Sequence, residues 1–260
     1  MKQFLSPFLV IFIFNTGIIA QNKLWIKAIR EYKTIDNITY GFHSEVSIKE
    51  READIALCQK SIKEDLELIN EKEYTTAIEI EFLASRKEML KYTGLAAQGM
   101  AMFDRNAIFM IHKTKNSPIK HEMMHMISMQ KWGDTAESSH WMNEGLGTYA
   151  GGTCSSYSLE EIYKYLLQSG RLIPMNELAN NFYGYNDMIT YTQSAFIVKY
   201  LIDNYGFEKF SSLWKNGFEK FESIYGMDFK IFESKIEAEI LIKYPKEIIF
   251  NWKEFNKGCI

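Results

Sequence analysis

Cysteine is scarce in this chain, and the spacing of the few that occur excludes one class of metal site. The three cysteines are Cys58, Cys154 and Cys259, and they form none of the short pairs typical of a structural zinc site. At most one disulfide can form. Cys58 lies at helical spacing on one stripe with Ile55 and Ile62, so we interpret it as a core residue. A bond between Cys154 and Cys259 is left as an open alternative.

A long apolar run is also missing. The most apolar stretch is at the start, in MKQFLSPFLVIFIFNTGIIA, where Pro7 and Asn15 leave only residues 8–14 uninterrupted. A membrane span needs roughly 20 such residues, so an uncleaved membrane anchor is the less favoured alternative. Lys2 before the apolar run and Ala20 after it are typical of a secretory signal peptide that is cut after Ala20.

The sequence therefore predicts a signal peptide at residues 1–20 and an exported mature chain of residues 21–260. We expect the mature chain in the periplasm or outside the cell, as a monomer, with no stable membrane span after cleavage. No repeat and no linker rich in Pro, Gly or Ser follows residue 20, which indicates one compact unit. The 30 basic and 33 acidic residues give a net charge of −3, and nothing points to a nucleic-acid partner.

The periodicity of the apolar residues divides the mature chain into two parts. The first part contains an extended segment at 38–44, a helix at 48–70, a strand at 75–82, a helix at 85–92 and a hairpin at 99–111 that turns at residues 104–106. The second part is helical, with helices expected from 117 to beyond 127 and at 139–150, 159–169, 191–204, 207–225 and 229–242.

Ser117 is expected to cap the first helix of that series, and Pro118 suits its first turn. The predicted fold class is α+β, with a small mixed N-terminal sheet and its helices followed by an all-helical C-terminal half. The boundary between these subdomains is expected between residues 132 and 133, which gives an α/β subdomain at 21–132 and a helical subdomain at 133–260.

The chemistry of the sequence concentrates in HEMMH, residues 121–125. Residues four apart lie on one face of a helix, so His121 and His125 can direct their imidazoles at one point. A catalytic zinc ion usually has three protein ligands, and Glu144 in WMNEGLGTYA supplies a third on the next predicted helix. The small residues Gly145, Gly147 and Ala150 would let the two helices approach closely. The alternative is a helix whose histidines are ordinary surface or core residues.

The other histidines, His43, His112 and His140, are interpreted as structural. His140 is close enough to Glu144 in sequence to lie in the second coordination shell. Asn143, next to Glu144, would either orient a ligating group or cap a helix, and the sequence does not decide between these roles.

These motifs resemble those of the gluzincin metallopeptidases, which include thermolysin and the M1 aminopeptidases. They are most similar to the short bacterial peptidase-MA-like domains. The resemblance rests on HEMMH, on the gap of 18 residues before Glu144, and on the Asn-Glu-Gly context of that glutamate. Two further stretches match: YTQSAFIVKYLIDNYG, residues 191–206, and Gly99–Phe103, which resembles the edge strand that pairs with an extended substrate. A plain structural hairpin is the competing interpretation of the second stretch.

The resemblance implies a thermolysin-like (zincin) catalytic domain that binds one Zn²⁺ per chain and acts on a peptide or protein substrate. His121, His125 and Glu144 would be the metal ligands, and Glu122 would be the general base that takes a proton from the attacking water. Tyr191 is the candidate donor to the oxyanion, with aromatic packing as its alternative role and Tyr149 as a reserve candidate.

The sequence departs from the aminopeptidase pattern in one stretch. Gly99–Phe103 has no acidic residue to hold a substrate amino terminus, and Asp104 falls at the expected turn. We therefore favour an endopeptidase or a peptidase of unspecified type. A non-catalytic binding module stabilised by zinc is the alternative from a different class, and a fourth protein ligand such as His140 would mark it. A related hydrolase of another amide or an ester is a further alternative.

Overall fold

A mixed five-stranded sheet forms the first half of the protein. The computed structural model describes residues 30–112 and 116–258, so the predicted signal peptide and Cys259 lie outside the described residues. The strands are β1 (Arg30–Ile35), β2 (Ile38–His43), β3 (Ile78–Leu83), β4 (Gly99–Met102) and β5 (Ala107–Ile111). Their order is β1-β2-β3-β5-β4, in which β2, β3 and β5 run parallel while β1 and β4 pair antiparallel with their neighbours.

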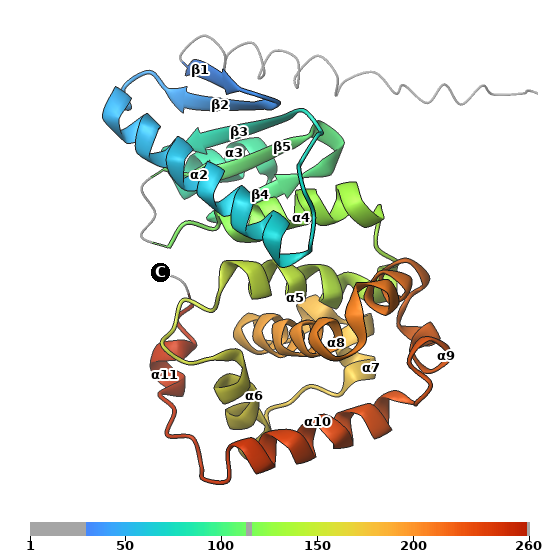
Figure 1. Cartoon of the computed structure of the whole chain (residues 1–260). Coiled ribbons are helices and arrows are strands. Elements are labelled where there is room, and N and C mark those ends of the chain that lie inside the picture. Colours follow the sequence, from blue (N-terminus) through green and yellow to red (C-terminus); the bar gives the residue numbers. More distant parts are fainter. Residues whose placement is uncertain (1–29, 113–115, 259–260) are drawn as a thin grey trace, which may run out of the picture.

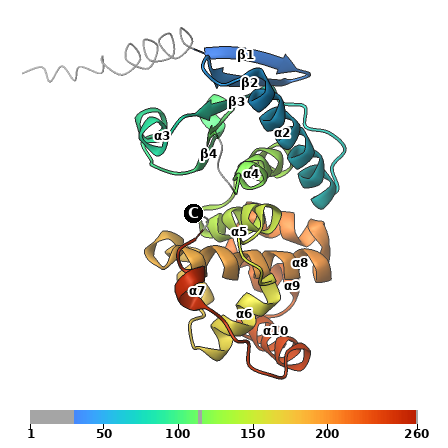
Figure 2. The same ribbon diagram turned by 90° about the vertical axis from the view of Figure 1, so that its left-hand side faces the viewer.

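The two faces of this sheet are covered by different helices (Figures 1 and 2). Side chains alternate along a strand, so Tyr40, Ile80 and Ile108 share the main core with α2 (Ile48–Leu68) and α4 (Ile119–Trp132). Leu83 and Phe109 pack with α3 (Arg86–Thr93) in a separate small cluster. In Figure 2 the sheet separates α3 from α2.

Local sequence signals explain most of these helix ends. Ser47 accepts from the backbone N–H of Glu50, whose side chain accepts from Ser47 in return, and this capping box begins α2. The expectation that Ser117 caps the metal-site helix is wrong. Pro118 occupies the N-cap position of α4 without a side-chain cap, and its carbonyl accepts from Glu122 N at 3.0 Å. The helix thus begins without a capping hydroxyl, at a proline whose φ of −77° suits a helix start.

The rest of the described chain is helical, and the predicted α+β class is confirmed. The helices are α5 (His140–Gly151), α6 (Leu159–Gln168), α7 (Met175–Asn180), α8 (Asp187–Asn216), α9 (Phe221–Tyr225), α10 (Phe229–Lys243) and α11 (Trp252–Phe255). Figure 1 shows α5 directly beneath α4, α8 beneath α5, and α10 at the far side from the sheet. Among the described residues, no helix combines the length and the apolar character that crossing a bilayer requires.

The predicted break between helices at 191–204 and 207–225 is confirmed, because α8 consists of two helical segments that meet at a kink, and only the outer ends differ from the prediction. Helix α8 begins earlier, where Asn186 caps it, and continues to Asn216 with a kink at Gly206, whose φ is 80°. Glycine adopts a positive φ without a steric penalty, so the helical conformation is interrupted at Gly206 and the chain changes direction between the two segments. The last part of the second predicted helix forms α9 instead.

Candidate metal centre and active site

Three side chains from the predicted site meet at the interface of α4 and α5. His121 and His125 lie on α4 with their rings edge to face and 4.6 Å between centroids. The Oε2 atom of Glu144, on α5, lies 3.3 Å from Nε2 of His121 and 3.7 Å from Nε2 of His125. One donor atom from each of the three residues falls within 4.8 Å of the others, so the group could hold a metal ion.

The close approach of the two helices depends on glycine at one position. A Cβ atom at Gly147 would lie 2.9 Å from Cε1 of His121, closer than real Cβ atoms approach, and 3.0 Å from Cε1 of His125, which is a tight contact. Gly145 does not face α4 as expected. A Cβ atom there would lie 2.8 Å from the backbone of Ser194, so this glycine faces α8. The glycines of α5 therefore face two different helices, and Gly147 makes room for the imidazoles.

Asn143 fixes the orientation of the second histidine. Its Oδ1 lies 2.9 Å from Nδ1 of His125. An amide oxygen can only accept, so Nδ1 carries the proton and the lone pair of Nε2 is directed toward Glu144. Asn143 stands in the interior of α5, which begins at His140. The hydrogen bond therefore favours the orienting role over the capping role.

The donor types in this group suit a cation, which would displace a proton from His121 on binding. Burial, assisted by the neighbouring His121, lowers the pKa of His125, which keeps that imidazole neutral. Burial acts against a charged His121 as well, but the hydrogen bond with Glu144 and the nearby carboxylates raise the pKa of His121 overall. Burial would likewise raise the pKa of Glu144, yet the two histidines hold it at about 2. Two imidazoles and one ionised carboxylate form a donor set that fits catalytic zinc.

Glu122 lies beside the group and contacts the edge of the sheet. Its side chain is buried, and its Oε2 accepts from the backbone N–H of Ala101 on β4 at 2.8 Å. A Cβ atom at Gly99 would lie 2.8 Å from Cγ of Glu122, so glycine at this position admits the glutamate. The carboxylate thus lies between the metal-site helix and the edge of the sheet.

A comparison with known families agrees with this geometry. The model of the Peptidase MA superfamily matches residues 87–241, more than half of the chain. The chain belongs to the Peptidase MA superfamily. No curated protein matches it significantly. The match covers Glu122 and the three candidate ligands, and it supports the suspected gluzincin-like character of this metallopeptidase-like domain.

Tyr191 of this Peptidase MA domain lies near His121. Its ring centroid is 6.1 Å from that of His121, and both residues line a cavity of about 420 Å³ together with Glu122 and Gly99. Burial, reinforced by the charge of Glu144, raises the pKa of Tyr191, so the phenol keeps its proton and can donate it in a hydrogen bond. Tyr149, the reserve candidate, has Lys199 Nζ 5.8 Å from its ring centroid.

Tyr183 is a site residue that the sequence did not reveal. Its hydroxyl donates to Oε1 of Glu144 at 3.0 Å, from the 3-10 turn η3 (Phe182–Gly184) that precedes α8. A single tyrosine in an irregular segment carries neither periodicity nor a motif spacing. Only the folded path of η3 brings it to the candidate ligand Glu144.

Asp65, on α2, is a second residue that sequence reasoning missed. Its side chain is completely buried, and neither carboxyl oxygen has a hydrogen-bond partner among the described residues. Burial raises the pKa of Asp65 from 3.8 to about 8, against the opposing charges of Lys120 and His121. Burial therefore favours the protonated form of Asp65 at neutral pH, where α2 packs against α4.

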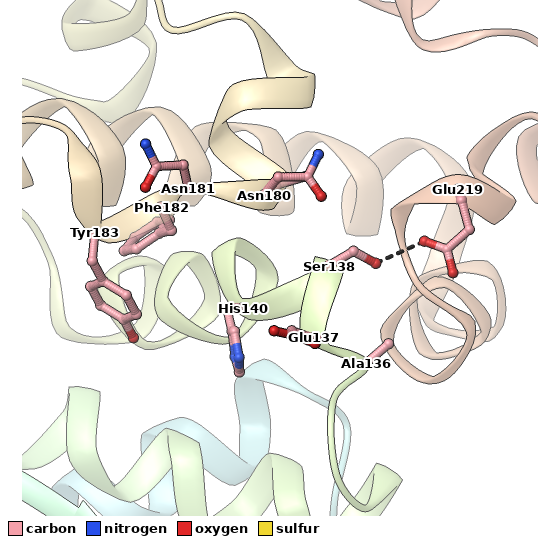
Figure 3. A pocket seen from close by; sticks show the side chains of 10 residues that line it. Ala136, Glu137, Ser138, His140, Asn180, Asn181, Phe182, Tyr183 and Glu219 are labelled. Carbon is pink, nitrogen blue, oxygen red and sulfur yellow. Dashed lines mark hydrogen bonds between the residues drawn. The ribbon is translucent and has the colours of Figure 1, made fainter.

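The remaining histidines lie outside the group of three. His112 has its Nδ1 2.6 Å from Oδ2 of Asp54, which agrees with a structural role. His140 is exposed and lines a cavity of about 460 Å³ with Glu137 (Figure 3). His43 ends β2 and is half-buried. Among the described residues, the candidate ligand group contains no fourth member.

Proposed function

We propose that this chain is an exported, zinc-dependent peptidase that hydrolyses peptide bonds. The observation that carries the proposal is the position of Glu122, a buried carboxylate beside a group of three candidate ligands and separate from it. A structural zinc site is closed by four protein ligands, whereas a catalytic site has three and a base beside them. The arrangement in this chain matches the catalytic type.

His121, His125 and Glu144 would hold the ion. Bound zinc would supply Lewis-acid polarisation of the attacking water and of the scissile carbonyl. Glu122 would accept the proton of that water and deliver it to the leaving amine, a role for which its carboxylate must be ionised before attack. Tyr191 would donate its phenolic hydrogen to the oxyanion that forms on the carbonyl.

The outer edge of β4 supports an extended peptide as the substrate. Gln98 O accepts from Ile111 N at 3.0 Å, just beyond the β4–β5 ladder. Hydrogen-bonded pairs alternate along an antiparallel ladder, so the backbone groups of Gly99 and Ala101 face away from β5. The bond from Ala101 N to Glu122 agrees with this assignment. An extended peptide could add to this edge as a further strand, next to the proposed base.

The same edge favours an endopeptidase or a peptidase of unspecified type over amino-terminal trimming. The residues of β4 are Gly, Met, Ala and Met, and none of them can pair with a substrate ammonium group. Asp104, the nearest acid in sequence, lies in the exposed 3-10 turn η1 (Phe103–Arg105) between β4 and β5.

A zinc-stabilised binding module is the second candidate that the sequence raised. A fourth protein ligand such as His140 would identify such a module. His140 is exposed and lines the cavity of about 460 Å³, outside the ligand group. The enzyme is therefore the proposal that the described residues support better. Hydrolysis of another amide or of an ester would use the same groups, and a substrate panel separates it from peptide hydrolysis.

Export is supported by the pattern of residues 1–20 and by Cys154. That cysteine is disulfide-bonded, while Cys58 is buried and free. Disulfides persist in oxidising compartments such as the periplasm and the cell exterior. Fractionation of cells that express the full chain, with sequencing of the mature N-terminus, tests this part; an intact Met1 in the cytoplasm would contradict it.

The test of the whole proposal is zinc content together with peptide cleavage in the mature chain, residues 21–260. We expect about one zinc per chain and cleavage of unfolded protein substrates, both lost in Glu144→Ala. Glu137→Ala, which removes an exposed glutamate from the second cavity, is the matched control and should retain both. A folded natural protein without zinc, never exposed to a chelator, would refute the proposal.

A further inference from the structure

Tyr183 reaches the metal centre from outside the motifs that define it. The residue is 65% exposed, yet its hydroxyl donates to a glutamate that is a candidate metal ligand, at 3.0 Å. A hydrogen bond to an ionised carboxylate is shorter and stronger than one between neutral groups. An exposed phenol held in this way calls for an explanation beyond packing.

The two carboxylate oxygens of Glu144 have separate partners. Oε1 accepts from Tyr183, whereas Oε2 faces Nε2 of His121 at 3.3 Å and Nε2 of His125 at 3.7 Å. The hydroxyl of Tyr183 therefore occupies the oxygen that is directed away from the histidines. Only Oε2 is left to face the position where the three donor atoms converge.

The ring of Tyr183 packs against a buried neighbour on one side, and its other side is open. Phe182 is buried and meets the ring of Tyr183 edge to face, with centroids 5.1 Å apart. Phe182 makes a similar contact with Tyr191, also at 5.1 Å. Tyr183 and Phe182 line the cavity of about 460 Å³ drawn in Figure 3, where the phenol stands apart from Ser138 and Glu219. The hydrogen bond, more than packing, holds the phenol beside Glu144.

We propose that Tyr183 is a positioning residue that restricts Glu144 to ligation through a single oxygen. The inference rests on the metal site of the proposed function. A carboxylate can bind a cation through one oxygen or through both, and a second oxygen would add a fifth donor beside the water of a catalytic zinc site. By engaging Oε1, Tyr183 would keep a bound zinc four-coordinate.

The test compares two phenol-to-phenyl substitutions in the mature chain. Tyr183→Phe removes only the hydroxyl that donates to Glu144. Tyr185→Phe removes a hydroxyl from the same segment that donates to Oε2 of Glu177, also at 3.0 Å. The apparent Kd for zinc is measured by competition with a chromophoric chelator, and the visible absorption of the Co²⁺ form reports the coordination number.

We expect Tyr183→Phe to weaken zinc binding by about tenfold or more, the range found when partners of metal ligands are removed. Its Co²⁺ bands should be weaker than those of the natural protein, because five-coordinate Co²⁺ absorbs less strongly than four-coordinate Co²⁺. Tyr185→Phe should match the natural protein in both measurements. Equal Kd values and equal spectra in all three proteins would overturn the inference.

X-ray absorption of the zinc-loaded natural protein gives an independent check that needs no variant. Two oxygens of one carboxylate at bonding distance from zinc would overturn the inference, and a single one would support it. A natural protein that binds zinc but cleaves no peptide would overturn the proposed function alone, because the inference is decided by metal affinity and coordination. A natural protein that binds no zinc would overturn both.

Discussion

Oδ1 of Asn143 lies 2.9 Å from Nδ1 of His125. Asn143, the residue before the candidate ligand Glu144, therefore orients the candidate ligand His125. The pair joins α5 to α4 independently of any ion. Such partners fix the tautomer and ring orientation of a ligating histidine. Because only Nε2 then carries a lone pair, the imidazole is arranged for a metal before the metal binds.

Removal of this acceptor should weaken metal binding. We expect Asn143→Leu to raise the Kd for zinc by roughly ten- to a hundredfold, measured by chelator competition. Asn143→Asp keeps an oxygen at the same place and should retain most of the affinity. If Asn143→Leu binds zinc as tightly as the natural protein, the orienting role is wrong.

Substitution of the proposed base should separate chemistry from metal binding. Glu122→Gln keeps the size of the side chain and an oxygen that can accept from Ala101 N, but it loses the ability to take a proton. We expect unchanged zinc content and a loss of at least about a hundredfold in kcat. Zinc analysis and a peptide cleavage assay on the same sample measure both, and full activity in this variant would refute the assignment.

The phenol of Tyr191 should matter for the rate and not for the metal. We expect Tyr191→Phe to lower kcat by about a hundredfold, the usual effect of one lost oxyanion donor, with zinc content unchanged. Tyr149→Phe on α5 serves as the control, because the same atom is removed from the reserve candidate. An unchanged kcat in Tyr191→Phe, or an equal loss in Tyr149→Phe, would contradict this role.

Asp65 should make the metal-free protein less stable as pH rises. The folded state holds the proton up to a pKa of about 8, whereas the unfolded chain releases it near the ordinary value of 3.8. The contribution of Asp65 to stability is therefore complete below pH 3.8 and is lost as pH rises through 8. Asp65→Asn removes this dependence.

Urea unfolding midpoints in the presence of a chelator at pH 4, 6 and 8 measure the effect. The natural protein should lose more stability between pH 4 and pH 8 than Asp65→Asn does. The histidines of the site titrate in both proteins, so the difference between the two curves isolates Asp65. Parallel curves would show that the carboxyl group ionises without cost, contrary to its burial.

The sequence predicted the parts of the candidate site that follow from local geometry. His121 and His125 are four residues apart on one helix, so their meeting required only that the helix form. Glu144 could be placed because a short loop returns the next helix across the first. Hairpin β4–β5 was also predictable, because two apolar runs flank a polar turn.

Contacts that depend on the tertiary path were not predictable. Tyr183 comes from an irregular turn, and no spacing relates it to Glu144. Gly145 and Gly147 look equivalent in sequence, yet the rotation of α5 aims one at α8 and the other at the histidines. Short elements such as α7 and β1 were missed because a segment of six residues shows too little periodicity.

The distribution of ligands between α4 and α5 makes a bound ion a cross-link between the sheet half and the helical half. His121 and His125 belong to a helix that packs under the sheet, and Glu144 belongs to the first helix of the layer below (Figure 1). An ion that binds only the folded chain stabilises it by about 2.7 kcal/mol at a hundred times its Kd. The melting temperature of this protein would then report the metal supply of its surroundings, and a zinc-poor environment would limit its lifetime as well as its activity.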